Sequence, residues 1–313
     1  MDEVQRYARF VQFKQALTGA QDYLLVGVDV AKAKPSGHDP ANRLLEDDAF
    51  TYTYDANGNR TTKIDKQTGA VTTYHYDVEN QLIQLELPSG QTARYRYDGL
   101  DRRIEKDLTG TLTRYLYDQE DILATYTGTN CWQSGFFHGP GIDQPYGLIR
   151  DDSGDCTAND AVGFREPLRF LQTDGLGSIT SLVSETSGFF RALFLAERYT
   201  YDAFGNPRIT GPGPDGQMDT ADDVILPESA LGNLYFFTGR EWDPESGLYY
   251  FRARYYDPLT GTFLQEDTFP KFPEDPQSFN RFSYAYHNPV NITDPSGHFA
   301  LVGTGVGLLE ALL

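Results

Sequence analysis

The sequence predicts a mainly β protein built from antiparallel hairpins, and three observations support this prediction. Aromatic residues make up 14% of the 313 residues, with 21 Tyr and 20 Phe, and aromatic side chains pack well on the pleated surface of a sheet. The 30 Gly and 17 Pro supply many turns. A Tyr-x-Tyr-Asp pattern also recurs at a nearly constant interval. A stack of short strands and tight turns accounts for all three.

Residues 1–41 precede the repeats and have a different character. We expect a short amphipathic helix over Val4–Leu17 and then a buried strand over Tyr23–Lys32. This strand resembles the opening strand of insertion-sequence transposases with an RNase-H-like fold, in which the aspartate, here Asp29, is the first metal ligand. One carboxylate does not build a metal site, and the later acidic residues of such enzymes have no match. We therefore interpret residues 1–41 as an unrelated leader left by a gene fusion or insertion.

Residues 42–126 carry the repeat. Copies of the pattern, four in close succession and a fifth after a long interval, end at Asp55, Asp77, Asp98, Asp118 and Asp202. The first four aspartates are 22, 21 and 20 residues apart. The two tyrosines of each copy are two positions apart, which places them on one face of a strand. Each copy is expected to be a hairpin that buries its face only by stacking, with tyrosines and aspartates that serve packing and turns.

Residues 127–170 interrupt the period and are predicted to form a loop-rich insertion. They include the stretches Gly139–Pro145 and Asp151–Asp155, which are rich in turn formers, and the two cysteines of the chain, Cys131 and Cys156. An even pair of cysteines in an exported protein is compatible with a disulfide, and two unpaired thiols are the alternative. The sequence leaves both interpretations open.

Residues 171–298 contain the densest motifs of the chain. These motifs are Thr173–Ser178, Gly247–Pro258, Gly261–Asp267, Asn280–Pro289 and Asp294–Gly297. In this order they resemble the core domain associated with Rhs repeats, with Gly175 in place of the usual His. The Tyr-Asp copies before them resemble the YD repeats of bacterial Rhs proteins, of the C components of insecticidal toxin complexes and of the teneurins.

The resemblance implies both a fold and a function. In the family, a strip of antiparallel hairpins spirals into a shell, or cocoon, and the core domain closes it as a plug. The shell encapsulates a toxin domain, and the core cuts the chain to release it; such proteins are secreted or lie at the cell surface. We therefore expect a mainly β chain with an antiparallel YD-repeat strip that forms a partial shell, a core plug, and a short helix at each terminus.

The resemblance also implies an aspartic-type autoprotease that acts on its own chain. Two aspartates held together share one proton, so that one carboxylate activates water while the other polarises the peptide carbonyl. A nearby arginine binds the developing oxyanion. The residues carried over are Asp267, Asp257 and Arg254. The cleavage motif consists of Asp294, Pro295, Gly297, His298 and Phe299, with the cut between the last two.

Two departures from the family pattern weaken this expectation. His298 stands where the family usually has Leu, and Thr262 stands where it usually has Arg. Self-cleavage is therefore expected to be slow or absent. The alternative is that Arg254, Asp257 and Asp267 form ion pairs and turn caps in an inert plug.

A second candidate site is an acidic loop that resembles aspartate-rich calcium loops. Its carboxylates belong to Asp215, Asp219, Asp222 and Asp223. Oxygen ligands at short spacing with a glycine suit Ca²⁺, although the Asp-x-Asp opening and closing Glu of an EF-hand are missing. A solvated acidic loop is the alternative, and we expect no other cofactor.

Charge and hydropathy exclude some functions. The formal net charge is −19, which repels a phosphate backbone and argues against nucleic-acid binding. The N-terminus has no basic segment followed by an apolar run, so we expect no signal peptide. No stretch reaches the roughly 20 apolar residues that span a bilayer. The apolar tail 299–313 is interpreted as truncated, with no toxin domain in the chain.

Three functions are compatible with the sequence. The first is the C-terminal part of a shell that cuts itself, whose partners are its own C-terminal extension and a shell-closing protein. The second is a non-enzymatic cell-surface or carbohydrate-binding module, since exposed aromatic faces suit cell-surface glycans. The third is an inert truncated remnant.

Overall fold

The computed structural model describes residues 37–154, 156, 166–186, 192–270, 276–298 and 301–302. The helices expected over Val4–Leu17 and near the C-terminus lie outside these residues, as does Asp29. Within the described part of the chain, no helix is long and apolar enough to cross a membrane. Nearly all regular structure there is antiparallel strand, which confirms the predicted fold class.

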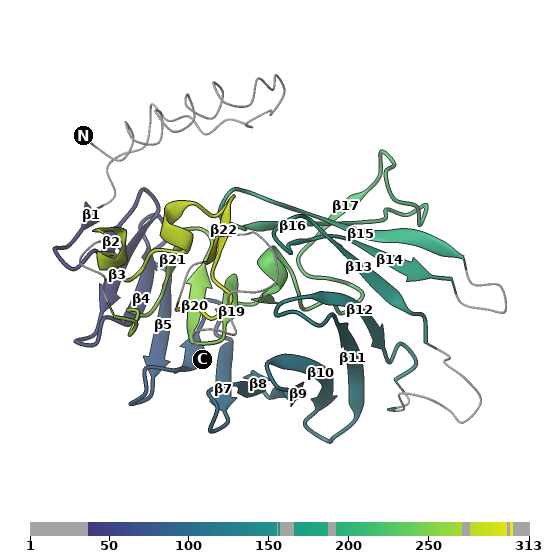
Figure 1. Ribbon diagram of the computed structural model, residues 1–313, viewed down its shortest axis with the longest axis horizontal. Coiled ribbons are helices and arrows are strands. Elements are labelled where there is room, and N and C mark those ends of the chain that lie inside the picture. The colour runs from purple at the N-terminus through teal and green to yellow at the C-terminus, as the bar shows by residue number, and fades with distance from the viewer. Residues whose placement is uncertain are drawn as a thin grey trace.

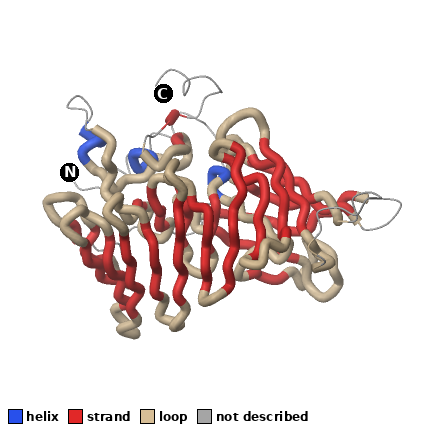
Figure 2. The backbone as a smooth tube through the Cα atoms, turned by 90° about the horizontal axis from the view of Figure 1, so that it is seen from below, coloured by secondary structure: helices blue, strands red, loops and turns tan. Residues whose placement is uncertain are grey.

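Seventeen strands form one long sheet. The first nine are β1 (Gly37–His38), β2 (Leu44–Glu46), β3 (Phe50–Tyr54), β4 (Arg60–Asp65), β5 (Val71–Tyr76), β6 (Leu82–Glu86), β7 (Thr92–Tyr97), β8 (Arg103–Leu108) and β9 (Thr111–Asp118). The others are β10 (Asp121–Thr127), β11 (Trp132–His138), β12 (Pro145–Arg150), β13 (Arg169–Thr173), β14 (Ile179–Glu185), β15 (Leu193–Tyr201), β16 (Pro207–Gly211) and β17 (Val224–Leu226). Figure 2 shows them side by side as a curved wall.

The long sheet is an open meander. Each strand pairs with the next one along the chain, and every pairing is antiparallel. Among the described strands, no pairing joins β17 to β1, so the shell is partial, as predicted. The sheet begins at Gly37, within the stretch that the sequence assigns to an unrelated leader.

The tyrosines of the repeat have two separate structural roles. The first tyrosines of the copies, Tyr52, Tyr74, Tyr95, Tyr115 and Tyr199, are only 2–8% exposed. The second tyrosine of each copy donates a hydrogen bond to the backbone carbonyl of the first residue in an earlier strand. These bonds are Tyr54 to Leu44, Tyr76 to Arg60, Tyr97 to Leu82, Tyr117 to Arg103 and Tyr201 to Ile179, at 2.6–3.0 Å. Each hairpin is therefore tied to one before it.

Four of the five repeat aspartates close turns. In Asp55, Asp77, Asp98 and Asp202, and likewise in Asp174 of the motif Thr173–Ser178, the carboxylate Oδ1 accepts the backbone N–H groups two and four residues further on. Side chains of this kind compensate turn N–H groups that no strand partner satisfies. The predicted role of these tyrosines and aspartates in packing and turns is confirmed.

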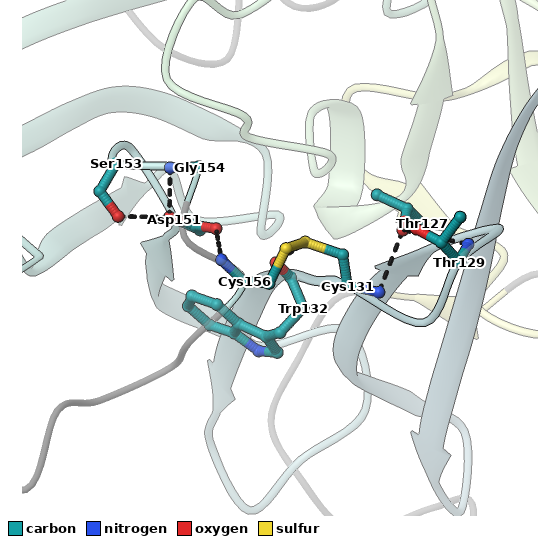
Figure 3. Close-up of a disulfide and its surroundings, with 8 residues drawn as sticks. All are labelled: Thr127, Thr129, Cys131, Trp132, Asp151, Ser153, Gly154 and Cys156. Carbon is teal, nitrogen blue, oxygen red and sulfur yellow. Dashed lines mark hydrogen bonds between the residues drawn. A yellow bond between two sulfur atoms is a disulfide. The ribbon is translucent and has the colours of Figure 1, made fainter.

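The stretch 127–170 is more regular than the expected loop-rich insertion. It contributes β11 and β12 to the long sheet, so the break in the repeat pattern does not interrupt the pairing. Cys131 and Cys156 form a disulfide, which settles the question that the sequence leaves open. The bridge ties the turn between β10 and β11 to the segment that follows β12 (Figure 3).

A second, smaller sheet lies on the concave side of the first (Figure 1). Its four strands are β18 (Glu241–Asp243), β19 (Leu248–Phe251), β20 (Arg254–Asp257) and β21 (Thr262–Phe263). Around it lie η2 (Phe237–Gly239), η3 (Pro276–Phe279), η4 (Ala285–His287) and the two-stranded sheet of β22 (Ile292–Thr293) and β23 (Leu301–Val302). We call residues 235–298 the plug. It starts later than residue 171, because β13 to β17 still belong to the long sheet.

Two aromatic clusters join the plug to the shell. In one, the repeat tyrosines Tyr74 and Tyr95 pack with Tyr250 and Tyr255 of the plug. In the other, Tyr115 and Tyr199 belong to a cluster with plug residues that include Tyr249, Phe251, Tyr256 and Tyr284. Burial of such large side chains is the main source of stability in an interface of this kind. The aromatic residues therefore fix the plug to the inner face of the strip.

Candidate functional site

Asp257, at the end of β20, is a buried anchor between plug and shell. One of its carboxylate oxygens, Oδ2, lies 2.8 Å from Arg60 Nη1 and 3.4 Å from Lys63 Nζ. The side chains of Asp257 and Arg60 are 1% and 0% exposed. Thr262, where the family usually has Arg, lies 3.4 Å from the same Arg60 guanidinium. Both cations come from β4, so this cluster links the small sheet to the long one.

Asp243, at the end of β18, forms an equivalent anchor. It contacts Arg103 and, at 2.9 Å, Lys106, both on β8. Burial alone raises the pKa of Asp243, but these two cations outweigh it, and the pKa is lowered. The two anchors have the same pattern: an Arg-x-x-Lys pair on the shell meets the first residue of an Asp-Pro-x-Ser/Thr-Gly turn on the plug. Both clusters hold the molecule together.

Arg254, at the start of β20, occupies a different position from the anchor arginines. Its Nη2 lies 3.1 Å from Asp267 Oδ2 and 3.6 Å from Asp294 Oδ2. The guanidinium carbon lies 3.7 Å from the centre of the Phe263 ring. Burial lowers the pKa of Arg254, and the two carboxylates oppose this shift. One buried cation thus holds two aspartates that are far apart in the sequence.

The cleavage motif is tied to the turn between β19 and β20. Arg254 Nε donates to the carbonyl of Gly297, and Arg252 Nη1 donates to the carbonyl of Pro295 at 2.5 Å. Gly297 has φ +76°, and a Cβ there would lie 2.3 Å from the carbonyl oxygen of Phe251. Only glycine allows the motif to approach the hairpin so closely. The chain is therefore held in place one residue before the expected cut.

His298 contacts one of these aspartates directly. Its Nδ1 lies 2.9 Å from Asp267 Oδ1, and the backbone N–H of Phe269 donates to the same oxygen at 2.9 Å. Burial raises the pKa of Asp267, but the hydrogen bond from His298 and the charge of Arg254 outweigh it. The pKa of Asp267 is therefore below its ordinary value of 3.8. This carboxylate is kept ionised.

These groups surround a small cavity of about 50 Å³. Its walls include Arg254, Asp267, Asp294 and His298, and Arg281 completes the charged lining. This volume is large enough to admit water. The arrangement places two carboxylates, an arginine and the residue before the expected scissile bond around a space that admits water.

The sequence identifies only part of this constellation. Arg254 and Asp267 come together as expected, whereas Asp257 is bound to Arg60 and Lys63 and takes no part in the Arg254 contacts. The second carboxylate at Arg254 belongs to Asp294, which the sequence reading assigns to the cleavage motif alone. Asp294 lies inside the Asp-Pro-x-Gly motif, only four residues before the expected cut, and this proximity is the sequence signal that could have identified it as a site residue. Phe299 lies outside the described residues.

The proposed calcium loop is organised by other contacts. Asp219 makes a bidentate contact of 2.8 Å with Arg198, and Asp223 accepts the backbone N–H of Asp219 at 2.9 Å. Asp222 accepts the hydroxyl of Thr220 at 2.6 Å. Among the described residues, Asp215 and its neighbours do not form a group of three converging metal-ligand atoms. A calcium ion at this loop stays a prediction.

Comparison with known proteins finds bacterial relatives that are named as nucleases. It is 29% identical over 270 residues to the tRNA3(Ser)-specific nuclease WapA of Bacillus spizizenii and 30% identical over 270 residues to the tRNA nuclease WapA of Bacillus subtilis (strain 168); each match covers 85% of this chain and 10% of the relative. The probable deoxyribonuclease RhsB of Dickeya dadantii is 38% identical over 87 residues, 26% of this chain and 6% of the relative. The chain spans about a tenth of the length of the WapA relatives.

Two solved structures match much of the chain at low sequence identity. The Photorhabdus luminescens Tc holotoxin pore matches 87% of this chain and 15% of its own, with 16% identity and a TM-score of 0.49. The crystal structure of TcdB2-TccC3-TEV matches 79% of this chain and 13% of its own, with 18% identity and a TM-score of 0.47. The family of the teneurin YD-shell matches residues 29–206, more than half of the chain. This protein therefore belongs to the YD-shell family.

Proposed function

We propose that this chain is the C-terminal part of a YD shell whose plug cuts the chain between His298 and Phe299 and so releases the segment that follows. The supporting observation is the position of Arg254, which contacts Asp267, Asp294 and the carbonyl of Gly297. In such a shell the partners are the C-terminal extension of the chain and a shell-closing protein. We place the protein outside the cell or at its surface.

The proposed reaction uses Asp267 as the base and Asp294 as the acid. A water molecule in the cavity attacks the carbonyl carbon of His298 and gives a proton to the Asp267 carboxylate. Asp294, only 3% exposed, gives its proton to the carbonyl oxygen, and Arg254 stabilises the charge that develops there. When the intermediate collapses, the C–N bond breaks and the amide nitrogen of the next residue takes up the proton from Asp267. One hydroxyl of the new carboxyl group returns its proton to Asp294, so that both aspartates regain their starting protonation states.

This assignment replaces Asp257 with Asp294 as the second carboxylate. A general base must reach the reacting water, so geometry has priority over motif similarity. Asp257 is 0% exposed and is neutralised by two shell cations, which leaves it no access to the cavity. Asp294 contacts the same arginine as Asp267.

The test is the intact mass of the purified chain over time, with Asp267→Asn beside it. We expect a native product that ends at His298 and a variant that stays at full length. Full-length mass for the native chain, at every pH and after long incubation, would overturn the proposal. Cleavage at the same position in the variant would remove Asp267 from the mechanism.

A second function, glycan binding by the outer face, is favoured by one observation. Phe137 and Tyr146 stack with ring centroids 6.3 Å apart, and they are 36% and 52% exposed. Phe170, 39% exposed, lies in the same row, with Gly147 between it and Phe137. Aromatic platforms of this kind suit sugar rings. A glycan array on which the native chain and Tyr146→Ala give the same signals would argue against this function.

A further inference from the structure

We infer that His298 is a positioning residue that makes self-cleavage depend on pH, through its contact with Asp267. The inference rests on the proposed self-cleavage and adds the regulation of that site. His298 is the residue whose peptide bond is cut, so the regulator is part of the substrate. In the structure its imidazole contacts the carboxylate of Asp267, which is proposed to activate water.

The geometry places Asp267 between a guanidinium and an imidazole. Oδ2 faces the Arg254 guanidinium at 3.1 Å, and Oδ1 faces His298 Nδ1 at 2.9 Å. The backbone N–H of Phe269 also donates to Oδ1 and is the third group that contacts this carboxylate. The charge on the imidazole therefore acts directly on the proton affinity of this carboxylate. The imidazole is 37% exposed and Asp267 is 14% exposed, so solvent reaches the imidazole.

The other charges around His298 keep their sign across the neutral range. Arg254 on β20 and Arg281 after η3 are cations, Asp267 is the ionised carboxylate of the lining, and Asp294 holds the proton that the proposed reaction uses. Glu266 pairs with Arg281 at 2.9 Å. Of the described residues that line the cavity, His298 is the one whose type ordinarily titrates between pH 5 and 8. The net charge of the lining therefore changes at this one residue.

The consequence for the reaction follows from acid–base chemistry. When His298 is protonated, Asp267 is paired with two full positive charges, and its carboxylate is a weaker base toward water. When the imidazole is neutral, Asp267 keeps a hydrogen bond without that charge, and it takes the proton of water more readily. Cleavage should therefore slow as pH falls through the histidine range. A leucine, which the family usually has at this position, removes this dependence.

The experiment measures cleavage rates from intact mass between about pH 5 and about pH 8 for the native chain, His298→Leu and His298→Gln. The glutamine keeps a hydrogen-bond donor but does not titrate, and it serves if the leucine variant fails to fold. We expect the native rate to fall by about tenfold or more from the upper to the lower pH. Both variants should change by less than about threefold over the same range.

A matched control is His75→Leu. His75 also lies near a carboxylate, at 3.3 Å from Glu86, but it is 45% exposed on β5 and outside the plug. This variant should keep the native pH profile. If the native chain and both position-298 variants cleave with the same profile, the role of His298 is overturned while self-cleavage stands. If none of them cleaves at any pH, the proposed function fails and the inference with it.

Discussion

Asp257 and Asp267 are ten positions apart in one motif-rich stretch, and each is paired with an arginine, yet their surroundings differ. Asp257 is enclosed by Arg60 and Lys63 of the shell. Asp267 contacts an arginine of its own plug and lines a cavity. The comparison teaches that motif similarity alone does not separate the two roles. An aspartate that pairs with two cations of the shell anchors the plug, whereas one that pairs with an arginine of the plug beside a cavity is positioned for catalysis.

The largest effect should come from breaking the anchor. Asp257→Asn leaves Arg60, which is 0% exposed, without its full counter-charge in the interior. Loss of one partner from a buried ion pair costs about 3–5 kcal/mol. Urea unfolding monitored by aromatic fluorescence should show this loss, while the variant that remains folded should still cut itself. A loss below about 1 kcal/mol would make the anchor interpretation wrong.

Asp267→Asn should have the opposite effect to Asp257→Asn: a large loss of cleavage rate with a small loss of stability. Removal of a general base slows a reaction by about 10²–10⁴-fold, whereas the unfolding free energy should change far less than in Asp257→Asn, because Asp267 lies at the edge of the cavity. The same urea series, run beside the mass measurement, gives both numbers. Equal destabilisation by the two substitutions would erase the distinction between them.

The disulfide gives the next largest effect. Cys131 and Cys156 are separated by 25 residues, and a loop of this size contributes about 3 kcal/mol in the chain-entropy view. The double variant Cys131→Ser with Cys156→Ser should be less stable by up to this amount. Reductant should lower the urea midpoint of unfolding of the native chain and leave the midpoint of the double variant unchanged. Sensitivity of both proteins to reductant would contradict the assignment.

A smaller effect is expected at the repeat tyrosines. The Tyr97 hydroxyl donates to the carbonyl of Leu82 at 2.7 Å, and a single hydrogen bond of this kind contributes about 1 kcal/mol. Tyr97→Phe should lower the unfolding free energy by this amount, and Tyr126→Phe, outside the Tyr-x-Tyr-Asp pattern, is a control. If Tyr97→Phe and Tyr126→Phe lower the unfolding free energy by the same small amount, the Tyr97 hydroxyl does not tie one hairpin to another.

The smallest effect concerns acid stability. The folded pKa of Asp267 lies below its ordinary value of 3.8, so its stabilising contribution is complete above that value and is lost as pH falls through the lower, folded pKa. The difference in unfolding free energy between the native chain and Asp267→Asn should therefore shrink below about pH 4. A difference that grows on acidification would mean that the sign of the shift is wrong.

The sequence predicts the fold well because its signals are local. The nearly constant interval between the Tyr-x-Tyr-Asp copies predicts stacked hairpins, and Tyr74 and Tyr95 are buried together, as their equivalent positions in the repeat require. The chain continues the same sheet through 127–170 without the pattern, because backbone pairing does not need Tyr or Asp. That continuity is set by tertiary contacts and is not visible in the motif.

The candidate site was harder to predict for a similar reason. Arg254 and Asp267 share one motif-rich stretch, so similarity finds them. Asp294 joins them only because Gly297 allows the chain to return against the turn between β19 and β20. Asp257 resembles a catalytic residue in sequence, and only its contacts with Arg60 and Lys63 reveal the anchor. Contacts between residues so far apart in the chain are not marked by any fixed spacing in the sequence.

The most direct test of the account compares Asp294→Asn with Asp257→Asn by intact mass, under conditions in which circular dichroism shows both to be folded. We predict that Asp294→Asn stays at full length and that Asp257→Asn yields the product ending at His298. The reverse result, with Asp257→Asn uncut and Asp294→Asn cut, would contradict the central claim that Arg254 gathers the two carboxylates that cut the chain.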